Sequence, residues 1–160
     1  MEQNKEAISL LNDLIRINND RIEGYEKAAS EIKDLSETEF KALFFQMAEE
    51  SRRYMSTLAE AVLRLGGEPA TSTSAAGDIY RVWMDVKAAF SGDDLLATLR
   101  ACEFGEDNAL KAYKTVLKKK DVSWPNGARE ILESQLASLQ TSHDKIKALR
   151  DEKARVSSNA

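Results

Sequence analysis

The sequence has very few of the residues that mark disulfide-bonded, hydrolytic or loop-rich proteins. Of its 160 residues, one is cysteine, one is histidine, two are proline and seven are glycine. The single cysteine, Cys102, excludes an internal disulfide and fits a reducing compartment. Its neighbours Leu99 and Ala101 predict a buried, unreactive thiol. A single histidine is too few for most hydrolytic sites.

The sequence also lacks long apolar runs and any strong excess of positive charge. No run approaches the eighteen apolar residues of a membrane span, and the first residues contain no apolar signal core. The net charge is -4, from 23 Lys plus Arg and 27 Asp plus Glu, so there is no broad positive field for nucleic acid. We therefore expect a cytoplasmic protein with no membrane span and no nucleic-acid partner.

The chain does contain four long segments in which apolar residues recur at steps of three and four, as on one face of a helix. They predict helices over about 4–34, 37–65, 94–119 and 127–152. Repeats near 3.5 residues are typical of helices that pack at shallow angles around a common core. The sequence thus predicts one all-α domain over residues 1–153, followed by a flexible tail over 154–160.

The connections between these segments predict the topology. Ser36 with Glu39 forms a capping-box pattern before the second helix, and Gly66 followed by Pro69 predicts where that helix ends. Short breaks within the first and second pairs of helices indicate two antiparallel hairpins. The long connection over 66–93, with an amphipathic segment predicted as a short helix over 78–90, can run the length of the bundle. Helices two and three therefore point the same way.

Polar residues interrupt the apolar faces near the middle of each helix. Asn18, Glu106 and His143 lie on the apolar stripes, and Glu50 flanks the stripe of the second helix. A buried polar group costs several kcal/mol unless it finds a partner. Counting at 1.5 Å per residue from the hairpin loops places all four at one level, to within about a turn. Asn18 and Glu106 also each precede a tyrosine by seven residues, which suggests two similar hairpins.

Metal chemistry gives one reason for such a polar layer. Di-iron bundles use a carboxylate from each of two helices and a Glu-x-x-His pair from each of the other two. The single positions here are Asn18 and Glu106, and the two pairs are Glu50 with Arg53 and Gln140 with His143. Only three of the six expected ligands are present. The six positions that define this predicted polar cluster are Asn18, Glu50, Arg53, Glu106, Gln140 and His143.

Several short motifs resemble those of a known family. They are residues 18–20 (Asn-Asn-Asp), 24–26 (Gly-Tyr-Glu), 49–54 (Glu-Glu-Ser-Arg-Arg-Tyr), 65–69 (Leu-Gly-Gly-Glu-Pro), 83–85 (Trp-Met-Asp), 105–107 (Gly-Glu-Asp) and 143–146 (His-Asp-Lys-Ile). With these motifs the chain resembles the DUF2383 family of bacterial four-helix-bundle proteins, within the ferritin-like superfamily, over about residues 7–151. The resemblance implies a ferritin-like fold and no established activity.

Three interpretations of the polar layer follow. In the first, the layer is a metal site converted into a salt-bridged network, with Arg53 as the permanent cation that neutralises Glu50 or Glu106. In the second, Glu50, Glu106 and His143 hold a single metal ion together with water. In the third, a full di-iron centre forms, although the first pair has lost its histidine.

The first interpretation predicts a non-catalytic accessory or stress-related bundle with no cofactor. We expect it to associate with itself, for example as a dimer, or with another protein. The crossover stripe of Ile79, Trp83 and Val86 either packs on the core or contributes a partner surface. The alternative is an iron- or manganese-binding oxidoreductase or storage protein that uses the remaining carboxylates and histidine.

Overall fold

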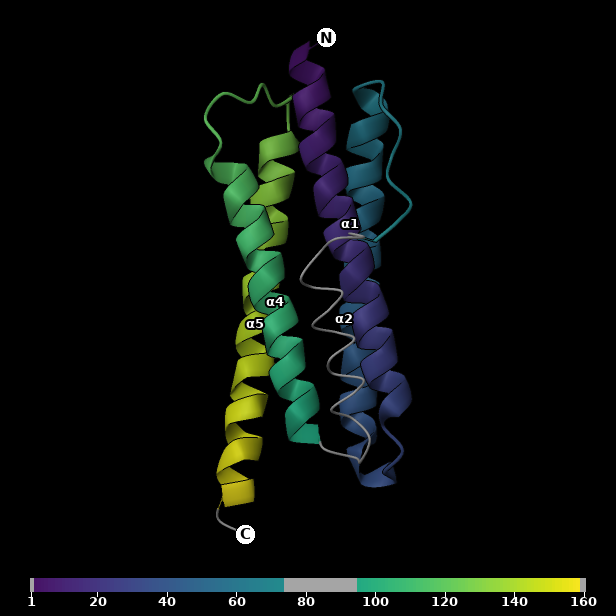
Figure 1. Cartoon of the computed structure of the whole chain (residues 1–160), viewed down its shortest axis with the longest axis vertical. Helices are drawn as coiled ribbons and strands as arrows, with labels where there is room; N and C mark the ends of the chain where they lie inside the picture. Colours follow the sequence, from purple (N-terminus) through teal and green to yellow (C-terminus); the bar gives the residue numbers. More distant parts are fainter. Residues whose placement is uncertain (1, 74–94, 159–160) are drawn as a thin grey trace.

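The chain forms a bundle of long helices in this computed structural model, which describes residues 2–73 and 95–158. Its helices are α1 (Glu2–Glu31), α2 (Thr38–Arg64), α4 (Leu95–Lys118) and α5 (Ala128–Ser158), with a single 3-10 turn, η1 (Leu35–Glu37), before α2. The described residues include no strand. The predicted all-α four-helix bundle, built from two antiparallel hairpins, is therefore confirmed (Figure 1).

The direction of the helices follows the predicted crossover. In Figure 1 α1 descends from the N-terminus, α2 and α4 both rise, and α5 descends to the C-terminus. The start of the crossover turns back along α1, where Asn12 accepts from the Ala70 amide at 2.8 Å and donates to the Glu68 carbonyl at 3.0 Å. Asn19 donates to the Ser72 carbonyl at 3.0 Å. The short helix predicted over 78–90 lies outside the described residues.

The two ends of α2 differ in how well the sequence predicted them. The C-terminal glycine cap is confirmed, because Gly66 has φ +84° and the Gly67 amide donates to the Val62 carbonyl at 3.0 Å. The capping box at the N-terminus is wrong. Ser36 donates through both its amide and its hydroxyl to the Asp34 carboxylate, and Asp34 is the N-cap of η1. An ionised carboxylate is a stronger hydrogen-bond acceptor than a neutral group, so Ser36 bonds to Asp34 instead of capping α2.

The tail predicted over 154–160 is helical as far as Ser158, and residues 159–160 lie outside the described residues. The last residues contain no glycine or proline that would break the helix. The predicted end near 152 was therefore too early.

The core consists of two apolar clusters separated by a polar layer. One cluster, nearer the η1 turn, contains Tyr25, Phe44, Met47, Leu99 and Ile146. The other is built from residues that include Leu11, Leu14, Leu58, Leu132 and Leu139. Contacts are densest within each hairpin, and the hairpins meet mainly through α1 and α4, with few contacts between α2 and α5. The α2–α5 side is therefore the more open side of the polar layer.

Candidate functional site

A buried arginine lies at the centre of the polar layer. Arg21 of α1 is only 2% exposed, and its Nε donates to Oε1 of Glu106 on α4 at 2.7 Å. Its Nη2 donates to Oε1 of Glu50 on α2 at 2.9 Å, and its Nη1 donates to Oγ of Ser51 at 2.8 Å. The planar guanidinium thus joins two carboxylates from different hairpins, a geometry that its fixed fork of donors allows.

Side chains from all four helices hold this arrangement. Tyr25, one turn after Arg21 on α1, donates from its hydroxyl to the same Glu106 oxygen at 2.6 Å, and its ring lies 5.3 Å from the guanidinium carbon. On the opposite side, Ser142 of α5 donates to Glu50 Oε1 at 2.9 Å. We call Arg21, Tyr25, Glu50, Ser51, Glu106 and Ser142 the Arg21 cluster.

The charges of the Arg21 cluster support one another. Burial alone would lower the pKa of Arg21, but the negative charges of Glu106 and Glu50 outweigh it and raise that pKa above its ordinary value. Burial, and then the neighbouring Glu106 charge, raises the pKa of the Tyr25 hydroxyl well above its ordinary value. Both groups therefore stay protonated and act as donors to Glu106. The same two causes raise the pKa of Cys102, which is buried as predicted.

A second, uncharged network lies one layer further along the bundle. Asn18 Nδ2 donates to the Tyr113 hydroxyl at 2.9 Å, and that hydroxyl donates to Gln135 Oε1 at 2.6 Å. Asn18 and Tyr113 are thereby paired, as are Glu106 and Tyr25. In each helix the polar residue and the tyrosine are seven residues apart. Because α1 and α4 run in opposite directions, the polar residue of each helix contacts the tyrosine of the other.

Four predicted members of the polar layer do not join the Arg21 cluster, and one of them, Asn18, belongs to the uncharged network. Arg53 is exposed, so its predicted role as the internal cation is wrong, and Arg21 fills it. Gln140 donates to Asp144 at 3.0 Å. His143 pairs with Asp107 and Asp144 at the edge of α4 and α5, so the structure brings together Glu50 and Glu106 but not His143.

Arg21 carried a signal that the sequence interpretation missed. It lies three residues after Asn18 and four before Tyr25, which puts all three on one face of α1. An arginine at that spacing on an apolar face needs a buried anion. Two carboxylates, Glu50 and Glu106, were already placed at the same level.

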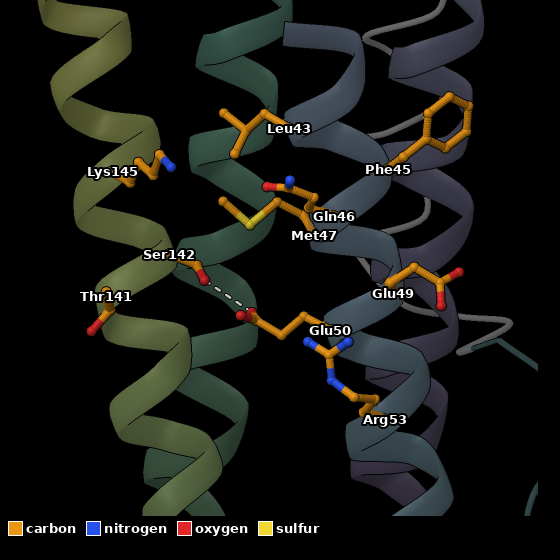
Figure 2. Close-up of a pocket in the computed structure, with 10 residues that line it drawn as sticks. All are labelled: Leu43, Phe45, Gln46, Met47, Glu49, Glu50, Arg53, Thr141, Ser142 and Lys145. Atoms are coloured by element: carbon orange, nitrogen blue, oxygen red, sulfur yellow. Dashed lines mark hydrogen bonds between the residues drawn. The ribbon is translucent and has the colours of Figure 1, made fainter. Parts of the chain in front are cut away.

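The Arg21 cluster opens to solvent at one side. A cleft of about 500 Å³ lies between α2 and α5 (Figure 2), and its polar wall includes Glu50, Arg53, Ser142 and Lys145. Figure 2 shows Glu50 and Ser142 pointing toward one another across this cleft. Glu50 is 21% exposed, whereas Glu106 is 0% exposed. Solvent therefore reaches the Glu50 end of the cluster.

A di-iron centre does not fit the side chains of the polar layer. The guanidinium of Arg21 occupies the space between the two carboxylates, and it has no lone pair to offer a metal. Asn18 is engaged with Tyr113, and no histidine reaches Glu50 or Glu106 among the described residues. Asn18 Oδ1 and Glu106 Oε2 are buried acceptors with no hydrogen-bond partner in that part of the chain. Two spare buried oxygens beside a fixed cation are too few ligands for two ions.

A different group of residues has the geometry of metal ligands. Within residues 2–73 and 95–158, the single such group of histidine, cysteine and acidic side chains is Glu103, Asp107 and His143. Each offers one ligand atom, and these atoms all lie within 4.8 Å of one another. This group, which we call the His143 group, joins α4 to α5, and Asp107 is its most exposed member.

Fold and comparisons together define the class as ferritin-like four-helix bundles. A mutant of Dps1 from Mycobacterium smegmatis is similar with a TM-score of 0.76 and 14% identity, over 93% of this chain and 97% of that one. The dodecameric thioferritin, a bacterioferritin-related protein from Bacteroides fragilis, gives 0.74 and 17%, over 98% and 90%. A ferritin-like diiron-carboxylate protein from Bacillus anthracis str. Ames gives 0.62 and 17%, over 98% of each chain.

Within this class, the chain belongs to the family described as "Domain of unknown function (DUF2383)", which matches residues 6–119. The resemblance found from the sequence motifs is thereby confirmed. A comparison with curated proteins gives no match. No helix within the described ranges is long and apolar enough to cross a membrane.

Proposed function

We propose that this protein is a non-catalytic ferritin-like bundle in which Arg21 replaces the metal ions of the polar layer. The observation that carries this proposal is the position of its guanidinium, between Glu50 and Glu106 at 2.9 and 2.7 Å. A permanent cation there performs the structural task of a metal, since it neutralises carboxylates from both hairpins. It supplies no redox chemistry and no site for oxygen.

The protein then acts through its surface and its assembly. Its similarity to a dodecameric thioferritin over almost the whole chain supports self-association as the mode of action. Exposed apolar side chains on α2 and α4, such as Leu63 and Phe104, are available for contacts with other copies or with a partner protein. We propose an accessory role, with a homo-oligomer as the working form and stress response as its setting.

Iron oxidation tests the absence of a centre in the polar layer. Protein purified without chelators is given ferrous iron in air, and oxidation is followed by absorbance beside a buffer blank. We expect iron to oxidise at the same rate with the protein as in the buffer blank. We also expect no pair of iron ions to stay bound at the polar layer after gel filtration. Rapid oxidation with two irons per chain, abolished in Glu106→Gln, would overturn the proposal.

Size-exclusion chromatography with light scattering tests the assembly. We expect a mass above that of one chain at high protein concentration, and Leu63→Glu or Phe104→Glu to lower it. The matched control is Glu60→Gln, an exposed change on the surface of α2. A strict monomer at every concentration would overturn the self-association.

The second candidate function is iron or manganese handling, as a metal-binding oxidoreductase or storage protein. It is favoured by the similarity to a ferritin-like diiron-carboxylate protein. In the iron experiment above, this function predicts metal that stays with the wild type and is lost in Glu106→Gln. It requires that Arg21 move away from Glu50 and Glu106.

A further inference from the structure

We propose that the His143 group binds one divalent transition-metal ion between α4 and α5. The ion would be bound by His143 Nε2 and by one carboxylate oxygen each of Glu103 and Asp107. None of these three side chains belongs to the Arg21 cluster.

The spacing of the three ligands suits one ion. Glu103 and Asp107 are four residues apart on α4, so they project from the same face of that helix. His143 faces them from α5, and its Nε2 lies 2.5 Å from Asp107 Oδ1. Tetrahedral ligands about 2.1 Å from a zinc ion lie about 3.4 Å from one another. Ligand atoms that all lie within 4.8 Å reach this spacing by small rotations, and Asp107, 58% exposed, has room to rotate.

The other nitrogen of the imidazole is already held as metal-binding histidines usually are. His143 Nδ1 lies 3.1 Å from Oδ1 of Asp144, and Gln140 donates to that same oxygen at 3.0 Å. A carboxylate on the second ring nitrogen orients the ring and leaves Nε2 as the ligand atom. This contact is independent of the acidic side chains on α4. It explains why Gln140, placed by its spacing in the polar layer, lies beside His143 without belonging to the Arg21 cluster.

Arg150 is the one described cation that already pairs with a member of the site. Its Nη1 lies 3.0 Å from Oε2 of Glu103, and its Nη2 lies 2.8 Å from Asp151. A carboxylate has two oxygens, so Glu103 can offer Oε1 to the ion while Oε2 keeps Arg150. The arginine then serves as an outer contact that orients the ligand, as second-shell partners commonly do.

The ligand chemistry selects the class of ion. One imidazole nitrogen with two carboxylates suits Zn²⁺, Co²⁺, Fe²⁺ or Mn²⁺, whereas Ca²⁺ and Mg²⁺ prefer oxygen ligands alone. Because three side chains leave positions open, water would complete the coordination. The proposed site is therefore an accessible site for a transition-metal dication.

The single histidine of the chain makes a direct test possible. Untagged protein is titrated with Zn²⁺ by calorimetry, and with Co²⁺ by absorbance, while NMR follows the one imidazole ring. We expect one ion per chain, a shift of the imidazole signals, and a cobalt absorption band in the visible range. Asp107→Asn and His143→Ala should each weaken binding at least about tenfold.

Two controls separate loss of ligands from loss of fold or charge. Asp13→Asn removes the same charge from a residue that is also 58% exposed, on α1, and should leave metal affinity unchanged. Circular dichroism and thermal melting show whether each variant keeps its helices. Asp107→Asn is the informative variant if His143→Ala unfolds, because Asp107 lies at the surface.

The outcomes also distinguish this site from the Arg21 cluster. Absence of Zn²⁺ and Co²⁺ binding, or binding that survives both His143→Ala and Asp107→Asn, overturns the His143 site. If the surviving ion is instead lost in Glu50→Gln, the metal lies in the polar layer, and the proposed function falls as well. Binding lost in the His143-group variants and retained in Glu50→Gln supports the site proposed here.

Discussion

Two clusters in this bundle pair one basic side chain with two carboxylates, yet they differ in burial. Arg21 contacts Glu50 and Glu106 inside the bundle, with exposures of 2%, 21% and 0%. His143 contacts Asp107 and Asp144 at the edge of α4 and α5, where the two carboxylates are 58% and 65% exposed.

The same kind of charge pair has opposite consequences in the two places. Inside the bundle, water cannot replace a lost partner, so each group of the Arg21 cluster depends on the others. At the surface, water and salt screen the pairs, and each contributes little to stability. The buried cluster is suited to fixing how the hairpins meet. The exposed one can exchange its partners for a ligand.

The largest expected effect comes from removing the buried cation. Arg21→Met leaves Glu106 buried with no opposite charge, and we expect the free energy of unfolding to fall by about 3–5 kcal/mol. Urea denaturation measures this change. Arg16→Met, which breaks the exposed pair with Asp13 on the same helix, is the matched control and should change stability by about 0.5 kcal/mol or less.

A double variant checks the reason for that loss. Adding Glu106→Gln to Arg21→Met removes the uncompensated charge and should recover part of the lost stability, because Glu50 keeps Ser142 and access to solvent. Equal losses in the single and double variants would contradict the electrostatic explanation.

The two buried tyrosines separate the charged network from the neutral one. Tyr25→Phe removes a donor to an ionised carboxylate and should cost about 1.5–3 kcal/mol, whereas Tyr113→Phe removes neutral hydrogen bonds and should cost about 0.5–1.5 kcal/mol. Both tyrosines are fully buried, so the two substitutions each remove one hydroxyl from an equally buried position. Denaturation of the two variants side by side gives the difference, and the reverse order would show that the Arg21 cluster is not the stronger network.

A smaller effect is expected from pH. Burial alone would lower the pKa of His143, but Asp144 and Asp107 outweigh it and raise the pKa above 6.5. The charged imidazole therefore stabilises the fold fully below about pH 6.5, and this contribution is lost as the pH rises through the folded-state value. The stability of the wild type over His143→Gln, measured by urea denaturation, should be largest below about pH 6.5 and should fade as the pH rises through the raised folded-state pKa of His143. Arg21 stays charged across this range, so the loss caused by Arg21→Met should not follow the same curve.

The smallest effect on stability is expected at the surface of the His143 group. Asp107→Asn should change the free energy of unfolding by less than about 0.5 kcal/mol without metal, since Asp107 is mostly exposed. Asp13→Asn should do the same. A thermal melt with and without Zn²⁺ should then separate them, because only Asp107→Asn loses the stabilisation by the ion. A large loss for Asp107→Asn without metal would show that the surface pair is structural.

The sequence predicted much of the fold because the fold depends on local patterns. Apolar residues at helical spacing located the four helices, and Gly66 marked the end of α2. The errors came at Ser36 and at residues 154–158, where helix ends depend on competing hydrogen bonds and on the absence of a strong breaker. The level of the polar layer was predicted by counting residues, and Asn18, Glu50 and Glu106 all lie close to it.

The sequence by itself determined that the chain is a four-helix bundle, that polar side chains interrupt its helical faces, and that Asn18, Arg53 and Gln140 stand at three positions of the di-iron pattern. Only the tertiary structure decided which cation lies inside. In the sequence, Arg21 and Arg53 each lie three residues after a residue of the polar layer, Asn18 and Glu50 respectively. A small rotation of a helix about its axis moves a side chain from the core to the surface. Because that rotation is set by packing between hairpins, Arg21 lies between Glu50 and Glu106, Arg53 faces solvent, and His143 meets Asp107.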